Sequence, residues 1–192
     1  VVNSASQNLF TDYDEASSAL EAELEKVITM QSLSDVPLGA FLSGGVDSSA
    51  IVALMQKQSK KPIKTFTIGF EDPDFDESTF ASEVASHLKT DHSELLVTAK
   101  DAQSIIPDLP HFYDEPFADY SQIPTYFVCK SAKQAVTVSL SGDAGDELFG
   151  GYNRYLMAPR LWSKFSKVPG FFRNIVGMIL LAIPIKFWDL IS

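Results

Sequence analysis

Serines and glycines crowd one short run of the chain, Leu42-Ser43-Gly44-Gly45-Val46-Asp47-Ser48-Ser49. The run follows an apolar stretch at 36–42 that is typical of a buried strand, and a helical pattern begins near Asp47. Ligands of α/β sheets bind at such strand-to-helix junctions. Glycines let the main chain approach an anion, serine hydroxyls add donors, and the start of a helix offers unpaired N–H groups. The run therefore predicts a phosphate-binding loop.

The aspartate within this loop adds a second kind of chemistry. A carboxylate at this position would repel phosphates unless a divalent cation bridges them, so Asp47 is a predicted Mg²⁺ ligand. The loop has neither the lysine of the G-x-x-x-x-G-K-S/T nucleotide loop nor the spacing of the G-x-G-x-x-G dinucleotide fingerprint. The structural alternative is a plain Ser-Gly-Gly turn in which Asp47 only caps the following helix.

A second run of glycines and acids, from Ser141 through Asp146 to Tyr152, follows another strand-like stretch. If both strands belong to one parallel sheet, Asp47 and Asp146 stand at carboxyl ends that meet at one edge. Two carboxylates facing a polyphosphate are the usual way to hold Mg²⁺. We therefore predict that Asp47 and Asp146 bind one Mg²⁺. The alternative is an acidic turn that caps a helix.

The elements that must position these residues alternate along the chain. Apolar or β-branched stretches predict strands at 36–42, 63–70, 93–98 and 135–140. Helical patterns lie before and between them, at about 20–31, 47–57, 76–88, 101–107 and 123–133, with Asp76 and Asp101 as predicted N-caps. This order predicts an α/β fold, a parallel sheet with helices on both faces. We assign 13–151 to this domain and 152–192, which lack a strand pattern, to a truncated helical region.

The composition describes an acidic globular chain. Of its 192 residues 45% are hydrophobic, and its net charge is −10. That charge argues against binding along nucleic acid, because phosphate contacts need a basic surface. The single cysteine, Cys129, can form no internal disulfide, which fits a reducing, cytoplasmic compartment. The longest apolar stretch, near 175–185, contains Pro184 and is too short for a bilayer, so no membrane span is expected.

Together, the two runs resemble the synthetase domain of the glutamine-hydrolysing asparagine synthetases, which are ATP-pyrophosphatase enzymes. The similarity extends from about Tyr13 to Pro159 and includes 35–39 and 65–70. It implies a Rossmann-like fold of the adenine-nucleotide α-hydrolase type, with ATP and Mg²⁺ as cofactors. It also implies that aspartate attacks the α-phosphorus of MgATP. The implied intermediate is β-aspartyl-AMP, formed with release of pyrophosphate, and ammonia then displaces AMP to give asparagine.

The resemblance also implies roles for individual residues. The nucleotide-contacting positions outside the loop are occupied by Leu42, Ile68, Gly69, Ser141 and Gly142. The pyrophosphate loop corresponds to Ser43, Gly44, Gly45, Asp47, Ser48 and Ser49. Asp47 and Asp146 match the metal-holding acids, and the implied catalytic residues are Asp47 and Asp143. Many members carry Glu at position 143 for the ammonia step, and Asp is shorter by one methylene.

The implied nitrogen donor lies outside this sequence. The family's glutaminase half opens with a cysteine nucleophile, whereas this chain opens with Val1, so we expect a fragment whose glutaminase domain is elsewhere in the full protein. Aspartate and ammonia are the expected small-molecule substrates, and a homodimer is a further expectation. Three alternatives stay open: a related synthetase that adenylates another carboxylate, as in β-lactam-forming or peptide-amidating enzymes; another ATP pyrophosphatase, of the tRNA-thiolating or GMP-forming kind; and a non-catalytic nucleotide-binding module.

Overall fold

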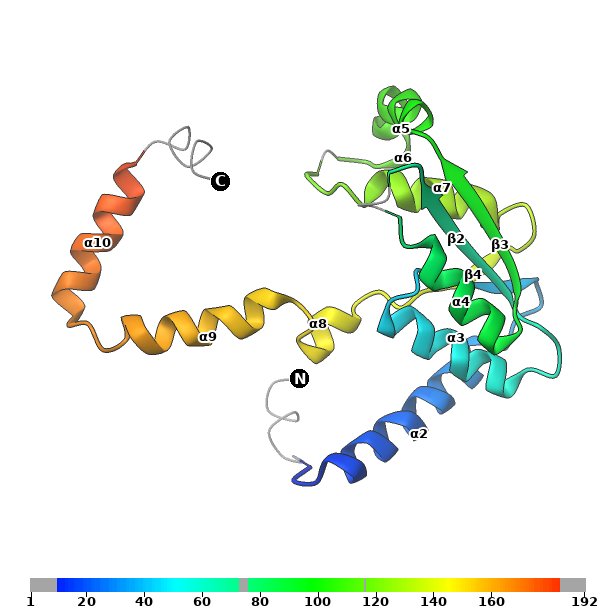
Figure 1. Ribbon diagram of the computed structural model, residues 1–192, viewed down its shortest axis with the longest axis horizontal. Helices are drawn as coiled ribbons and strands as arrows, with labels where there is room; N and C mark the ends of the chain where they lie inside the picture. The colour runs from blue at the N-terminus through cyan, green and yellow to red at the C-terminus, as the bar shows by residue number, and fades with distance from the viewer. Residues whose placement is uncertain (1–9, 73–75, 116, 184–192) are drawn as a thin grey trace. The chain divides into compact units, whose positions relative to one another are not determined.

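The computed structural model describes residues 10–72, 76–115 and 117–183. The chain divides into two units, Val1–Asp143 and Ala144–Ser192, and each is described by itself. Strands occur only in the first unit among these described residues (Figure 1).

The first unit is built on a parallel sheet with the strand order β3-β2-β1-β4. Its strands are β1 (Leu38–Phe41), β2 (Lys64–Phe70), β3 (Asp91–Val97) and β4 (Val138–Leu140). Ala40 at the centre pairs with Thr65 on one side and Leu140 on the other. Each connection between neighbouring parallel strands passes through at least one helix, as parallel pairing requires. The predicted parallel α/β sheet is confirmed.

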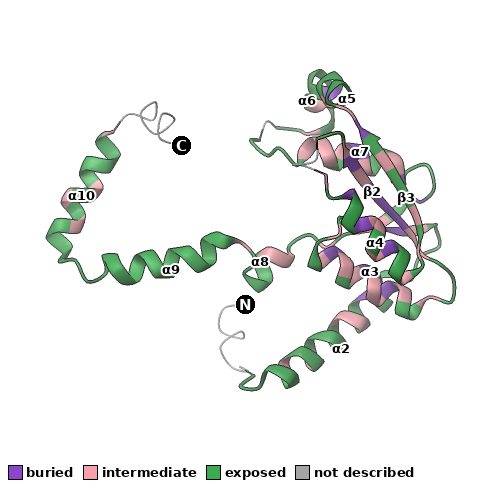
Figure 2. Ribbon diagram, viewed as in Figure 1, coloured by how far each residue is buried: buried purple, intermediate pink, exposed green. Residues whose placement is uncertain are grey.

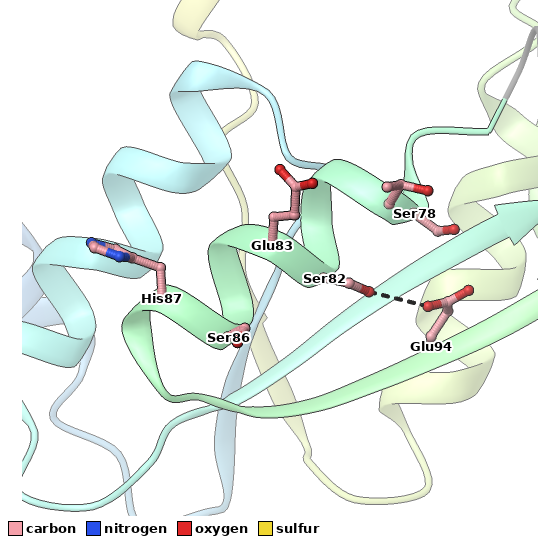
Figure 3. A pocket seen from close by; sticks show the side chains of 7 residues that line it. Ser78, Ser82, Glu83, Ser86, His87 and Glu94 are labelled. Carbon is pink, nitrogen blue, oxygen red and sulfur yellow. Dashed lines mark hydrogen bonds between the residues drawn. The ribbon is translucent and has the colours of Figure 1, made fainter.

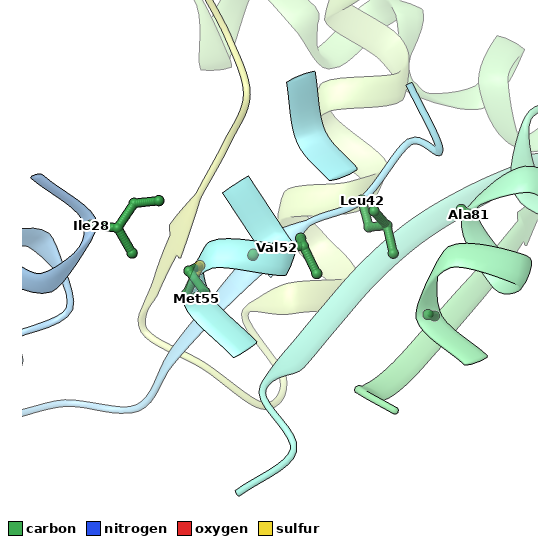
Figure 4. Close-up of a cluster of buried hydrophobic side chains, with 7 residues drawn as sticks. Ile28, Leu42, Val52, Met55 and Ala81 are labelled. Carbon is green, nitrogen blue, oxygen red and sulfur yellow. The ribbon is translucent and has the colours of Figure 1, made fainter. Parts of the chain in front are cut away.

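One face of the sheet is covered by α2 (Tyr13–Gln31), α3 (Val46–Gln58) and α4 (Ser78–Leu88). Their apolar faces meet β1 in one buried cluster, part of which Figure 4 shows. The cluster contains Ile28, Ala40, Leu42, Val52, Met55, Ala81 and Ala85. The predicted apolar stripe around 20–31 therefore contributes Ile28, its most buried member, to the core.

The opposite face is covered mainly by α7 (Gln122–Ala132). Phe66 of β2 packs there with Ala132 and Val136, while Phe127 packs with Val97 and Ile105. The short elements α5 (Ala99–Ile105), η1 (Ile106–Asp108) and α6 (Leu109–Phe112) complete this side. Burial is concentrated along β1 and β2 and on the inner faces of the helices (Figure 2). Helices on both faces of the sheet are thus confirmed.

Local boundaries differ from the sequence predictions in a few places. The N-cap of α4 is Glu77, and the Asp76 carboxylate accepts hydrogen bonds from Ser78, the first residue of the helix. Helix α5 begins earlier than predicted, because Thr98 caps it and Asp101 completes a reciprocal capping box. The fourth strand begins only at Val138, since the amide groups of residues 135 and 136 donate to Ala132 O in the turn after α7.

The second unit contains α8 (Gly145–Phe149), α9 (Asn153–Phe165) and α10 (Gly170–Ala182). Helices α9 and α10 lie within the stretch beyond residue 151 where helices were predicted, and residues 184–192 lie outside the described part. No side chain of these three helices is buried within the described residues. None of the helices that the structure describes is both long enough and apolar enough to cross a membrane.

Candidate active site

The predicted phosphate loop lies between β1 and α3, at the carboxyl edge of the sheet. Leu42 extends β1 by one step, because its N–H donates to Phe66 O at 2.9 Å. Its side chain is only 1% exposed and belongs to the buried cluster under α3. A contact of Leu42 with a nucleotide would therefore come from its main chain.

Gly44 fixes the path of this loop. Its φ of +82° lies in the left-handed region that side chains rarely adopt. A Cβ added here would lie 2.7 Å from Phe80 Cβ and 2.7 Å from Ala81 N, at the start of α4. The loop therefore rests on α4, and position 44 has no room for a side chain.

Ser48 is the hydrogen-bonding centre of the loop. Its hydroxyl accepts from Ser43 N at 3.2 Å, donates to Gly45 O at 3.2 Å, and lies 2.9 Å from Ser43 Oγ. Gly45 N donates in turn to Ser43 Oγ at 3.3 Å. Ser48 is buried, whereas Ser43 and Gly45 are exposed. Ser48 thus holds the shape of the turn from inside, and the main chain on its outer side faces solvent.

The start of α3 has the features of an anion site. Its N-cap is Gly45, which offers no side-chain oxygen to the first-turn amides, and Val46 is 86% exposed. The Ser49 hydroxyl is buried and has no hydrogen-bond partner in the part of the chain the structure describes. Phosphate oxygens would satisfy both sets of donors. The loop and helix start therefore fit a polyphosphate.

Asp47 lies in this first helical turn, with its side chain half-buried. Within the described residues, no hydrogen bond or ion pair to its carboxylate is found. Mg²⁺ takes oxygen ligands and is commonly held by one or two carboxylates together with substrate phosphates. Asp47 lies beside the predicted phosphate site, and its carboxylate has no partner within the described residues. It is therefore available to the predicted cation, and in this respect the site fits Mg²⁺.

The end of β4 meets the same helix start. A Cβ added at Gly142 would lie 2.6 Å from Ser48 N and 3.0 Å from Ser48 Cα. The structure therefore brings Gly142 against Asp47 and Ser48, as the sequence analysis expects of residues at one edge of the sheet. Ser141 Oγ donates to Asp143 Oδ2 at 2.9 Å, which orients the Asp143 carboxylate.

The end of β2 contributes Ile68 and Gly69. Ile68 packs on the α7 side of the sheet, and Leu42 packs on the α3 side. A Cβ at Gly69 would lie 3.1 Å from Ser78 Oγ and 3.2 Å from Asp76 Oδ1. Hydrogen bonds from Ser78 hold the pKa of the Asp76 carboxyl below its usual value.

Asp146 belongs to α8, in the second unit. Next to it, the Tyr152 hydroxyl donates to Glu147 Oε1 at 2.6 Å. This bond raises the pKa of Tyr152 to about 12 and lowers the pKa of Glu147. The Arg154 guanidinium stacks 4.2 Å from the centre of the Tyr152 ring. The shared metal site of Asp47 and Asp146 stays a prediction.

Sequence reasoning missed the support that α4 gives to the loop. Phe80 and Ala81 lie against Gly44, and Asp76 braces the end of β2 through Phe70 N at 3.2 Å. No spacing in the sequence links Phe80 to position 44, because the contact depends on how α4 crosses the sheet. The glycine itself was the available signal, since a glycine within a loop often marks a close approach.

Comparison with known proteins gives one consistent result. A family model described as asparagine synthase matches residues 19–186. The putative asparagine synthetase (glutamine-hydrolyzing) 2 of Methanocaldococcus jannaschii is 42% identical over 164 residues, which cover 85% of this chain and 31% of that protein. Asparagine synthetase (glutamine-hydrolyzing) 1 of Bacillus subtilis is 36% identical over 174 residues, which cover 91% and 27%. The chain thus spans less than a third of the length of these curated relatives.

A solved structure is similar in fold. The NMN synthetase from Francisella tularensis superposes with a TM-score of 0.51 at 14% sequence identity, over 72% of this chain and 59% of that one. At this identity the likeness concerns the fold alone, and it agrees with the parallel sheet described above. The family match covers the sheet, the loop after β1 and the acidic run after β4. This chain therefore belongs to the asparagine synthase family, as part of its ATP-dependent synthetase domain.

Proposed function

We propose that this chain supplies the nucleotide site of an enzyme that adenylates aspartate with ATP and converts it to asparagine. The observation that carries the proposal is the loop at 43–49: a turn with a left-handed glycine, Gly44, that leads into a helix start whose amide groups no side chain caps. Ammonia is the proposed nitrogen source, made from glutamine by a glutaminase domain outside these residues. The glutamine-hydrolyzing relatives named above support this choice.

The loop acts on the part of ATP that leaves. When the aspartate carboxylate attacks the α-phosphorus, negative charge grows on the departing pyrophosphate. The N–H groups at the start of α3 and the Ser43 and Ser49 hydroxyls stabilise that charge from a turn that Ser48 and Gly142 hold in place. A carboxylate is a poor electrophile, and adenylation gives it a leaving group. Positioning and charge stabilisation are therefore the main tasks of this site.

Carboxylates supply the remaining groups. Asp47 and Asp146 are the proposed ligands of Mg²⁺, which supplies positive charge to the phosphates when bound. Asp143 is proposed for the second step, in which ammonia attacks the activated carbonyl carbon and AMP leaves. The attacking nitrogen must lose a proton, and the Asp143 carboxylate is the proposed acceptor. Its hydrogen bond from Ser141 holds the carboxylate beside the end of β4.

The test identifies the nucleotide that the full-length protein releases from ATP. With MgATP, aspartate and ammonia, AMP and pyrophosphate should appear together, and only when aspartate is present. AMP that forms only with a different carboxylic acid would move the substrate and keep the chemistry. Release of ADP and phosphate, or no turnover with any acid, would show that the loop at 43–49 has another use.

Substitution separates the two proposed steps. Asp47→Asn should remove Mg²⁺-dependent ATP binding, while Asp143→Asn should leave adenylation intact and impair transfer to ammonia. The matched control is Asp12→Asn, which changes an equally charged side chain at the N-cap of α2, outside the proposed site. Asparagine formation at the wild-type rate by the Asp143 variant would remove Asp143 from the ammonia step.

A further inference from the structure

Strand β3 forms an edge of the sheet. It pairs with β2 along its whole length, and no described residue forms a strand on its outer side. Asp91 N donates to Ile63 O at 2.8 Å, which fixes the backbone groups that face β2. Successive residues of a parallel strand turn their N–H and C=O groups to opposite sides. The backbone groups of His92, Glu94 and Leu96 therefore point outward from the sheet.

A groove flanks this edge on each face of the sheet. The first, of about 700 Å³, lies between α4 and β3 and is shown in Figure 3. The second, of about 470 Å³, lies between β3 and α7. Side chains alternate along a strand, so Glu94 faces the α4 groove and Leu95 the α7 groove. One open strand edge thus has a recess for side chains on each side.

The α4 groove is acidic and polar. Glu83 and Glu94 line it, and both are exposed. Ser82 Oγ donates to Glu94 Oε2 at 3.3 Å, which holds the carboxylate toward the helix (Figure 3). Ser78 and Ser86 add hydroxyls one turn away on either side. This groove therefore suits a cationic side chain that also donates hydrogen bonds.

The α7 groove has a different character. Phe66, Leu95 and Phe127 are among its apolar lining residues, and its polar lining includes Asp101, Lys130 and Gln134. This groove suits an aliphatic side chain. Alternating cationic and aliphatic side chains are what one extended segment would present to the two grooves in turn.

We propose that the outer edge of β3 binds an extended basic segment of another polypeptide, which adds to the sheet as a further strand. Its main chain pairs with the outward N–H and C=O groups of His92, Glu94 and Leu96. Lysine or arginine side chains at every second position enter the α4 groove, and aliphatic ones enter the α7 groove. Main-chain bonds supply affinity in this mode, and the grooves supply the sequence preference.

A second copy of this chain does not suit the edge. Antiparallel self-pairing about the middle of β3 would place Glu94 opposite Glu94, and like charges directly opposite destabilise a strand pair. The chain as a whole also carries a net charge of −10. An exposed charge on an edge strand deters indiscriminate pairing, so Glu94 selects a partner with a cation at the matching position.

The experiment uses the whole chain and a labelled, capped heptapeptide of alternating valine and lysine. Fluorescence anisotropy should show saturable binding, and hydrogen exchange should show slower exchange at the amides of Glu94 and Leu96. Glu94→Lys should weaken binding at least tenfold. Leu96→Pro should do the same, because it removes an outward N–H and no bond to β2. Glu23→Lys on α2 makes the same change of net charge away from the edge, and should bind like the wild type.

Three results would overturn the proposal. They are equal binding of a peptide in which glutamate replaces lysine, unchanged exchange at the outward amides on saturation, and self-association in sedimentation that Leu96→Pro abolishes. Circular dichroism of each variant establishes that it is folded. If Glu94→Lys does not fold, Leu96→Pro and the exchange measurement on the wild type still decide the matter.

Discussion

The main chain at Gly142 packs closely against Ser48 at the start of α3. Gly142→Ala places a Cβ 2.6 Å from Ser48 N, so either β4 or the start of α3 must move. We expect nucleotide affinity to fall at least tenfold, measured by calorimetric titration with a non-hydrolysable MgATP analogue. Gly177→Ala is the matched control, because nothing lies within 4 Å of its added Cβ in α10. Equal affinity of both variants would show that the loop does not depend on β4.

Ser48 and Ser49 have different predicted roles in the loop, one in stability and one in nucleotide binding. Ser48→Ala removes the centre of the hydrogen-bond network and leaves Ser43 N without a buried partner, a loss of about 1–3 kcal/mol in the free energy of unfolding. Ser49→Ala removes a hydroxyl that has no partner within the described residues. It should leave stability nearly unchanged and weaken nucleotide binding. Urea unfolding and the same titration measure the two effects, and a reversed pattern would contradict these roles.

His92 makes stability depend on pH. Its Nδ1 lies 2.9 Å from Thr65 Oγ1, while its Nε2 is buried without a partner in the described structure. Burial lowers the pKa of the His92 imidazole below its ordinary value. The unfolded chain then binds a proton at a pH where the folded chain does not. The stabilisation is therefore complete above about pH 6.5, the unfolded pKa, and is lost as the pH falls toward the folded pKa.

The measurement is urea unfolding at pH 7.5 and pH 5.5. The free energy of unfolding should be lower at pH 5.5, and His92→Gln should reduce the difference. His87→Gln, at an exposed position on α4, is the control and should leave the difference as it is. An NMR titration of His92 that gave a pKa above 6.5 would reverse the expected sign.

At the scale of elements, α2 is held to α3 mainly by apolar burial. Ile28 is 2% exposed, whereas its neighbour Val27 is 36% exposed. The ion pair of Lys57 with Glu21, at 3.0 Å, is largely exposed and adds little. Ile28→Ala should cost about 2–5 kcal/mol of unfolding free energy and Val27→Ala well under half of that. Equal losses in urea unfolding would mean that α2 does not pack as described.

Elements with strong periodicity were predictable from the sequence, and those defined by tertiary contacts were not. The apolar run before the loop is buried on both faces of the sheet, so its hydrophobicity alone indicated β1. Leu109–Phe112 forms a helical turn in a proline-containing stretch between 107 and 123, where the sequence analysis gave no helix or strand. Residues 135–140 were predicted to be a strand from their β-branched residues, but β4 begins at Val138, and Val136 packs with Phe66 and Ala132 before it.

The same division holds for the candidate site. The loop at 43–49 and its junction with Gly142 followed from the glycines and from the rule that parallel strand ends meet at one edge. The contact of Phe80 with Gly44 depends on how α4 crosses the sheet, which no local pattern encodes. The orphan hydroxyl of Ser49 was equally inaccessible, since burial of a single oxygen emerges only from packing.

At the scale of the whole molecule, charge and apolar surface are unevenly distributed. Residues 152–183 contain no acid and five cations: Arg154, Arg160, Lys164, Lys167 and Arg173. Large apolar side chains on the same helices are exposed, among them Trp162 at 63% and Leu181 at 88%. Exposed apolar patches of this kind promote association.

We therefore expect the chain to self-associate at micromolar concentration through α9 and α10. Trp162→Glu combined with Leu181→Glu should shift sedimentation toward the monomer. As a control, Met30→Glu combined with Leu33→Glu, at side chains 63% and 81% exposed in the first unit, adds the same charge and should leave association unchanged. If the control dissociates the chain as well, total charge rather than the helix surface governs association.

The strand order also limits the order in which the sheet can form while the chain is being synthesised. The pairing of Ala40 with Leu140 joins positions one hundred residues apart, whereas β1, β2 and β3 follow one another closely. A nascent chain can assemble those three strands first, but it must wait for β4 before Gly142 closes on the start of α3. Contacts so distant in sequence form slowly. The candidate nucleotide site is thus the last part of the sheet to be completed, and a ligand that needs Gly142 in place would bind only after β4 has paired.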